Sequence, residues 1–316
     1  MARILQLVDP ALLAAGAAWV AAPTSACEPL AADASSATGA TSKDRAGRAV
    51  ALININGQGP FRFILDTGAN RSVLSQSLAD RLGLAHAGEG LVHSIDGATL
   101  AKLVNVESFT FGALHLSGGE TPVLDGPMLD GENGLLGVDG MVGRALHVDF
   151  DKHCVEIYEG GARIPLQGWL SVPARLRFGS LLMVEGDIQG VQVNVLIDTG
   201  SDTSLANQRF REALREVAAG SIEYHGGRAF TFGRPVLLEQ SVWTPSLRLG
   251  RTVVDGVRAF IGDFHIFELW GLHDEPTLLI GMDVLARSRE MVIDYEHRVV
   301  HFRKRPRGSS RDAPTR

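Results

Sequence analysis

The sequence has few cysteines and no cysteine motif. Only Cys27 and Cys154 occur among its 316 residues. They form no C-x-x-C pair, which excludes a cysteine-rich structural zinc site and thioredoxin-like redox chemistry. The sequence does not decide whether these two cysteines form a disulfide, which is disfavoured if the segment around Cys27 is removed or disordered.

A phosphate-binding loop and an excess of basic charge are also missing. No glycine-rich loop follows a strand pattern, so nucleotide chemistry finds no support. The formal net charge of -6 argues against a nucleic-acid partner. The basic residues gather in the tail, residues 304–316, which has no apolar face and which we expect to be disordered. The composition, 45% hydrophobic and 21% charged, is that of a folded soluble protein.

Long hydrophobic runs are missing except near the N-terminus. There, Arg3 precedes an apolar stretch over residues 11–22, and small residues follow before Cys27. This order predicts a signal peptide over residues 1–26 and a flexible linker over residues 27–47, and hence a periplasmic or secreted protein. The stretch is short for a membrane-spanning helix. The alternatives are membrane anchoring through a lipid at the cysteine and a cytoplasmic N-terminal helix.

The rest of the chain contains one unit twice. The first opens with RAVALININGQGPFRFILDTGAN and the second with SLLMVEGDIQGVQVNVLIDTGSD. Each has an apolar strand, a glycine turn, a second strand and then Asp-Thr-Gly. Each ends with two aliphatic residues, a glycine and an acid two residues later, followed by a strand hairpin. We therefore expect a duplicated all-β protein with short helices and two lobes, over residues 48–165 and 166–303.

Asp66 and Asp198 occupy the same place in the two units, directly after aliphatic strands. A buried carboxylate is costly unless it is hydrogen-bonded or shared. Two carboxylates that meet across a pseudo-twofold axis cannot both ionise, so they share one proton. The ionised member can take a proton from a water that attacks a carbonyl, while the protonated member supports the oxygen that becomes negative. This chemistry needs no covalent intermediate, and we expect neither a metal nor a cofactor.

The neighbours of the two acids fit this interpretation. The hydroxyls of Thr67 and Thr199 can hydrogen-bond across the axis and lock the two loops together. Gly68 and Gly200 let the backbone turn sharply and bring N–H groups to the carboxylates. The hydroxyl of Ser201 can hydrogen-bond one acid, which would make the two environments unequal.

The segments FILDTGA and VLIDTGS, with GLLG and LLIGMDVL downstream, resemble the retropepsin-like aspartic peptidases of bacteria. The resemblance covers roughly residues 48–303 and implies acid-protease lobes with the active site between them. It also implies Asp66 and Asp198 as the catalytic dyad, with each acid loop crossing the later aliphatic-glycine segment in a ψ shape. Because one chain carries both halves, as in pepsin-like enzymes, a monomer is favoured. A homodimer in which equivalent lobes pair is the alternative.

The family closes over its substrate with a glycine-rich hairpin flap. In the first unit, Asp96 and Gly97 form a hairpin-turn pair that predicts a flap tip. In the second unit, Tyr224, Gly226 and Gly227 lie near a plausible tip. The alternative for both is an ordinary surface hairpin.

Two further segments look like insertions, residues 118–134 and 259–276. They could form a substrate rim, a dimer interface or an autoinhibitory loop. The second segment contains His265, Glu268, His273 and Asp274, but their spacing matches no metal-binding helix motif. We therefore interpret them as loop residues and not as metal ligands.

The sequence predicts an aspartic endopeptidase that cleaves peptide or protein substrates. The alternatives are a catalytically silent peptide-binding module with the same fold and a structural or partner-binding protein. Both acids, both threonines and both glycines are present, which favours the enzyme.

Overall fold

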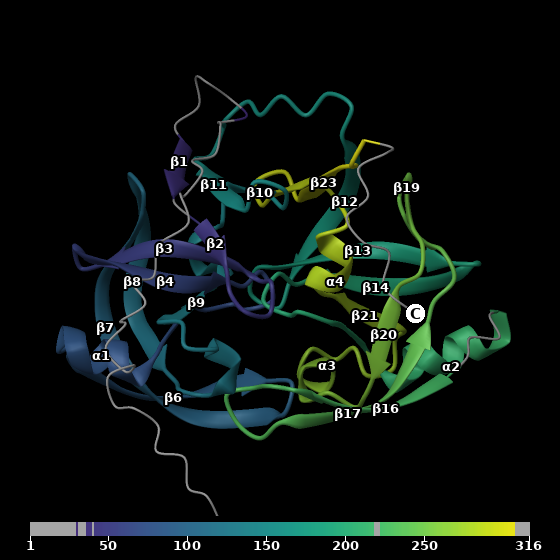
Figure 1. The fold of residues 1–316 in the computed structure, drawn as a ribbon, viewed down its shortest axis with the longest axis horizontal. Coiled ribbons are helices and arrows are strands. Elements are labelled where there is room, and N and C mark those ends of the chain that lie inside the picture. The colour runs from purple at the N-terminus through teal and green to yellow at the C-terminus, as the bar shows by residue number, and fades with distance from the viewer. Residues whose placement is uncertain (1–29, 31–35, 40, 218–221, 307–316) are drawn as a thin grey trace, which may run out of the picture.

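The computed structural model describes residue 30 and residues 36–39, 41–217 and 222–306. In this part of the chain strands dominate and the helices are short, which confirms the predicted all-β class. The strands build two lobes, purple to teal and green to yellow in Figure 1. No helix among the described residues is long and apolar enough to cross a membrane. The predicted signal peptide lies outside these residues.

The N-terminal lobe contains an eight-stranded sheet. In sheet order its strands are β2 (Thr41–Lys43), β3 (Ala49–Ile55), β4 (Gln58–Leu65), β9 (Gly134–Leu136), β5 (Val73–Leu74), β8 (Leu114–Val123), β7 (Gly97–Phe111) and β6 (His86–Ser94). Its helical elements are α1 (Gln76–Leu82) and the 3-10 turns η2 (Pro127–Leu129) and η3 (Val138–Gly140). Helix α1 begins after Ser75, whose hydroxyl accepts the N–H of Leu78 at 3.2 Å, and ends at Gly83 in the left-handed conformation.

The second sheet has 15 strands and continues from the interlobe region into the C-terminal lobe. In sheet order they are β1 (Ser36–Gly39), β11 (Cys154–Tyr158), β10 (Ala145–Asp149), β22 (Glu290–Asp294), β23 (Val299–Arg303), β12 (Leu170–Arg177), β13 (Leu181–Ile188), β14 (Val191–Ile197), β21 (Thr277–Ile280), β15 (Ser204–Ala206), β20 (Arg258–Ile261), β17 (Val236–Trp243) and β16 (Ile222–Ala229). Strands β18 (Leu247–Leu249) and β19 (Thr252–Val254) pair beside β13. The helices are α2 (Gln208–Val217), α3 (His265–Leu269) and α4 (Met282–Leu285).

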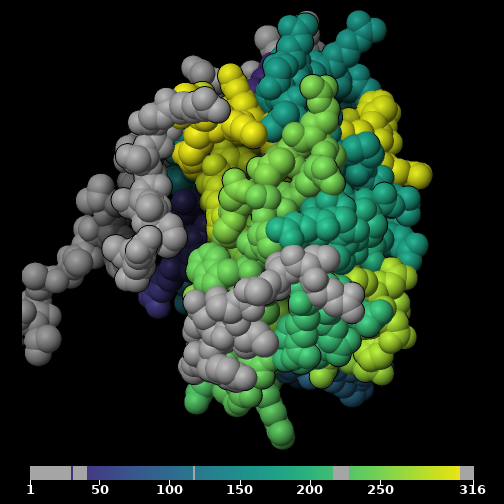
Figure 2. Space-filling model, turned by 90° about the vertical axis from the view of Figure 1, so that its right-hand side faces the viewer, coloured from purple at the N-terminus to yellow at the C-terminus, as the bar shows by residue number. Residues whose placement is uncertain are grey.

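The strand hairpins predicted at the ends of the two units meet between the lobes. Strand β10 of the first unit pairs antiparallel with β22 of the second, with Leu146 opposite Ile293. Every residue of β10 and β11 is buried, and one hydrophobic cluster runs from Phe63 in the first lobe to Val195 in the second. The lobes therefore share a core, which fixes their relative position. In the side view of Figure 2, most of the face turned to the viewer is formed by the second unit, coloured green to yellow.

Two predicted unstructured segments are partly structured. Within the predicted linker, β1 pairs with β11 and β2 pairs with β3. This pairing uses backbone N–H and C=O groups, so the small polar side chains of the segment do not reveal it. In the predicted tail, Arg305 forms an ion pair with Asp151 and donates to the carbonyl of Ala286 at 2.9 Å. Residues 307–316 lie outside the described part.

Cys154 is buried in β11 and is disulfide-bonded. The chain's other cysteine, Cys27, lies outside the described residues.

Candidate active site

Each Asp-Thr-Gly motif begins where a central strand ends. Strand β4 runs parallel to β9, and β14 runs parallel to β21. The backbone N–H of Asp66 donates to the carbonyl of Leu136 at 2.9 Å, and that of Asp198 donates to Ile280 at 3.0 Å. Both lobes therefore hold the acid loop against the later aliphatic-glycine segment, which is the crossing that the family resemblance implied.

The two aspartates meet between the lobes. Their side chains interact electrostatically, and Asp66 and Asp198 are 4% and 9% exposed. The N–H of Gly68 donates to Asp66 at 2.9 Å, and the N–H of Gly200 donates to Asp198 at 2.8 Å. A β-carbon on Gly68 would lie 2.5 Å from Cγ of Asp198, and one on Gly200 would lie 2.2 Å from Cγ of Asp66. Glycine thus lets each loop approach the opposite carboxylate.

The two threonines connect the loops reciprocally. The hydroxyl of Thr67 accepts the N–H of Thr199 at 3.0 Å and donates to the carbonyl of Ile197 at 2.8 Å. The hydroxyl of Thr199 accepts the N–H of Thr67 at 3.2 Å and donates to the carbonyl of Leu65 at 2.7 Å. All four bonds run between the lobes and are buried, so they hold the two acid loops at a fixed separation.

A second layer of polar residues, which the sequence interpretation missed, supports each loop. The hydroxyl of Ser72 donates to Asp139 at 2.8 Å and accepts the N–H of Gly137 at 3.1 Å. The second unit repeats both bonds at the same distances with Ser204, Asp283 and Gly281. The signal was available, because a serine stands six residues after the aspartate in both motifs.

Ser201 supports the dyad through its backbone. Its N–H donates to Asp198 at 3.2 Å, whereas its hydroxyl donates to the carbonyl of Thr203 at 2.7 Å. The expected hydroxyl contact with an acid is therefore replaced by a bond within the turn, because the short side chain points along its own loop.

The environments of the two carboxyl groups are unequal. Burial, and then the charge of Asp66, raise the pKa of Asp198 well above its ordinary value. Burial also raises the pKa of Asp66, but hydrogen bonds and the charge of Arg48 oppose this shift. The pKa of Asp198 is therefore raised further than that of Asp66. The sequence interpretation gave no role to Arg48.

The predicted tip of the first hairpin lies at a turn. Asp96 precedes Gly97 between β6 and β7, and Ser94 pairs with Gly97 at the last position of the ladder. In Figure 1 this hairpin runs along the bottom of the molecule toward the C-terminal lobe.

The tip of the second hairpin is displaced from its predicted position. The chain turns between β16 and β17 at residues 230–235. The predicted tip residues Tyr224, Gly226 and Gly227 lie inside β16, where the pairing with β17 shifts register. The two glycines therefore accompany a bulge and not the turn, because glycine serves both purposes.

Each hairpin tip contacts the opposite lobe. The side chain of Asp96 accepts the N–H of Arg234 at 2.9 Å, and the carbonyl of Ile95 accepts the N–H of His265 at 3.0 Å. Ile95 also packs against a C-terminal cluster that includes Phe264. A cluster of the N-terminal lobe receives Phe232 in the same way. The hairpins thus lie closed in this structure.

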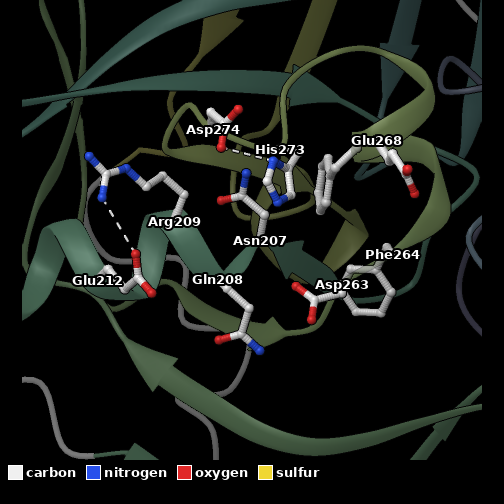
Figure 3. Close-up of a pocket in the computed structure, with 10 residues that line it drawn as sticks. Asn207, Gln208, Arg209, Glu212, Asp263, Phe264, Glu268, His273 and Asp274 are labelled. Carbon is white, nitrogen blue, oxygen red and sulfur yellow. Dashed lines mark hydrogen bonds and ion pairs between the residues drawn. The ribbon is translucent and has the colours of Figure 1, made fainter.

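A separate cavity of about 340 Å³ lies between the start of α2 and α3. Figure 3 shows Arg209 turned toward Glu212 and His273 turned toward Asp274, at 3.4 and 2.9 Å. The cavity is lined by Asn207, Gln208, Arg209, Glu212, Asp263, Phe264, Phe267, Glu268, His273 and Asp274. Neither carboxyl group of the dyad lines it.

The four residues considered as metal ligands do not come together. Glu268, His273 and Asp274 line the cavity, whereas His265 stacks on His93. Within the described ranges, no group of three or more His, Cys, Asp or Glu side chains is arranged to hold a metal ion.

A two-lobed β fold whose paired Asp-Thr-Gly loops join two buried carboxyl groups defines the aspartic proteases as a class. The aspartyl protease family model matches residues 51–139 and 184–284, which together make up more than half of the chain. The chain therefore belongs to the aspartyl protease family. A search of curated proteins gave no match.

Proposed function

We propose that the protein is an aspartic endopeptidase that hydrolyses peptide bonds with a water activated between Asp66 and Asp198. The observation that carries this proposal is the pair of buried carboxyl groups, each held against the glycine of the opposite acid loop, in unequal environments. Such a pair can supply a general base and a general acid at the same pH.

The proposed reaction follows from this inequality. Asp66, as the carboxylate, takes a proton from the water while the water oxygen bonds to the peptide carbon. Asp198, as the acid, gives its proton to the carbonyl oxygen. Gly68 and Gly200 hold the carboxyl groups through their N–H groups, and the threonine bonds keep the two loops in register. Pre-organisation of this kind lowers the barrier because little rearrangement is needed.

The proposed substrate is an extended polypeptide that binds between the lobes, where backbone pairing to strand edges gives affinity. Because Asp96 and Ile95 contact the C-terminal lobe, the hairpins must open to admit it. Both halves of the site come from one chain, so we propose a self-sufficient monomer. Export to the periplasm stays a prediction from the N-terminal sequence.

A silent peptide-binding module is the second candidate. It would have the same fold and cleft without needing the dyad. The complete dyad and its two threonines favour the enzyme, since a binding module has no use for a shared proton.

The test is cleavage of an unbiased peptide library between about pH 3 and 8. The wild type is compared with Asp66→Asn and Asp198→Asn, and with Asp187→Asn, near the end of β13, as a control outside the acid loops. Cleavage by the wild type and the control alone is the expected result. A silent wild type that still binds peptides would favour the binding module, and activity in either dyad variant would contradict the proposed mechanism.

A further inference from the structure

Arg48, which directly precedes β3, is a buried arginine at a position where the second unit has none. Its side chain is 7% exposed, and that of its ion-pair partner Asp44 is 0% exposed. The residue that aligns with it in the second unit is Ser180, which is neutral and lies in a turn. The two acid loops repeat each other down to individual hydrogen bonds, so Arg48 is a charge that breaks their symmetry.

The guanidinium group of Arg48 is held on three sides. Its Nε donates to Asp44 at 2.6 Å. One Nη donates to the carbonyl of Gly200 at 3.3 Å, and the other donates to the carbonyl of Met128 at 2.8 Å. The backbone N–H of Arg48 also donates to Asp44, at 2.8 Å. The ion pair is therefore oriented with its positive end toward the acid loop of the second lobe.

This loop brings the charge close to the dyad, because the N–H of Gly200 donates to Asp198. Gly200, whose carbonyl Arg48 binds, has its α-carbon against the carboxylate of Asp66, since an added β-carbon would lie 2.2 Å from Cγ. Screening is weak in a buried site. Accordingly, the charge of Arg48 lowers the pKa of Asp66, against the upward effect of burial. Tyr295 is a further titratable group that interacts with Asp66, and its own raised pKa keeps its phenol neutral.

We infer that Arg48 is a positioning residue that assigns the two roles in the dyad, keeping Asp66 ionised as the base and leaving the shared proton on Asp198. This inference rests on the proposed function. In the first step the proton of water passes to Asp66, and that of Asp198 passes to the substrate oxygen as the new C–O bond forms. In the second step Asp66 returns its proton to the leaving nitrogen as the C–N bond breaks, and Asp198 recovers its proton from the hydroxyl that becomes the product carbonyl. Each turnover thus restores the carboxylate beside the cation.

The test uses two variants: one removes the charge of Arg48 together with that of Asp44, and the other leaves Arg48 without its counter-ion. The double variant Asp44→Asn/Arg48→Gln removes both charges and keeps polar groups in place. Asp44→Asn alone leaves the cation uncompensated. Arg62→Gln is the control, because Arg62 forms a more exposed ion pair in the same lobe, with Glu132 at 2.6 Å, that does not contact the acid loops.

Two readouts separate this inference from the proposed function. The first is a carbon-13 NMR titration of the aspartate carboxyl groups, assigned with the dyad Asn variants, which needs no activity. The second is the acid limb of the pH profile of kcat/KM. In the double variant, both the Asp66 titration and the acid limb should move up by about one pH unit. In Asp44→Asn they should move down, and in Arg62→Gln they should not move.

A purely structural role for Arg48 predicts lower activity in both Asp44 variants without opposite shifts. That result, or titration of Asp198 before Asp66 in the wild type, would overturn the inference while leaving the endopeptidase proposal intact. If the wild type is inactive but the Asp66 titration shifts as predicted in the variants, the proposed function alone is refuted. If the double variant does not fold, the downward shift in Asp44→Asn decides the question.

Discussion

The imidazole rings of His93 and His265 are stacked 5.2 Å apart with ring nitrogens at 2.9 Å, although they belong to different repeat units. His93 lies on β6 and His265 begins α3, so the pair joins the first hairpin to the C-terminal lobe. Together with the contact between Asp96 and Arg234, it closes the hairpin by exposed polar contacts. Such contacts contribute little free energy individually, which suits a segment that has to open.

The first prediction concerns this closure. In Asp96→Ala, amide hydrogen exchange around residues 94–98 and 230–235 should become faster, because the acceptor for the N–H of Arg234 is lost. The free energy of global unfolding should fall by less than about 1 kcal/mol, since the contact is exposed. Asp187→Ala, near the end of β13, is the control and should leave exchange at both tips unchanged. Unaltered exchange in Asp96→Ala would mean that apolar packing alone holds the hairpin.

The second prediction concerns the reciprocal threonines. Thr67→Val should lower the free energy of unfolding by about 3 kcal/mol, because it leaves the N–H of Thr199 and the carbonyl of Ile197 buried without a partner. Thr67→Ser keeps the hydroxyl and should retain most of the stability. The control is Thr244→Val, since the buried hydroxyl of Thr244 has no partner among the described residues. Chemical denaturation of the three variants measures the differences, and equal losses in both valine variants would contradict the assigned role.

The third prediction concerns the glycines that face the carboxyl groups. Gly200→Ala should abolish peptide cleavage, because its β-carbon would have to displace Asp66. Gly68→Ala should act in the same way on Asp198. Gly90→Ala is the matched control, since its β-carbon would meet Leu103 at an ordinary 3.4 Å. Measurable cleavage by Gly200→Ala would show that the loops have more room than the structure gives them.

The duplication made most of the fold predictable. A repeated strand, motif and terminal hairpin indicated two β lobes, and the symmetry placed Asp66 and Asp198 on one axis. The tip of the second hairpin was misplaced because glycines mark bulges as well as turns. Ser72 escaped notice because its partner Asp139 comes from a distant segment, and Arg48 because its contacts with Gly200 and Met128 do. Ser201 was assigned a wrong contact because its loop geometry, not its residue type, decides where the hydroxyl points.

The last prediction concerns a buried charge network between the lobes, remote in sequence from the dyad motifs. His147 lies between two glutamates, with ring nitrogens 3.0 Å from Glu156 and 3.4 Å from Glu290. Burial alone would lower the pKa of His147, but the two glutamates raise it overall. Burial alone would raise the pKa of Glu290, but His147 and then the charge of Arg303 lower it overall.

These opposite shifts define a window of highest stability. The raised pKa of His147 contributes stability that is fully present below the ordinary histidine value of 6.5 and is lost as the pH rises through the shifted value. The lowered pKa of Glu290 contributes stability that is present above the ordinary value of 4.5 and is lost as the pH falls through the shifted one. Thermal unfolding should therefore give the highest Tm between these two values. In His147→Gln the loss of Tm above the window should be smaller than in the wild type. The control is His115→Gln, on the exposed face of β8, in which the loss of Tm should equal that of the wild type. A wild-type Tm that rises steadily from acid to alkaline pH would show that other groups govern the stability.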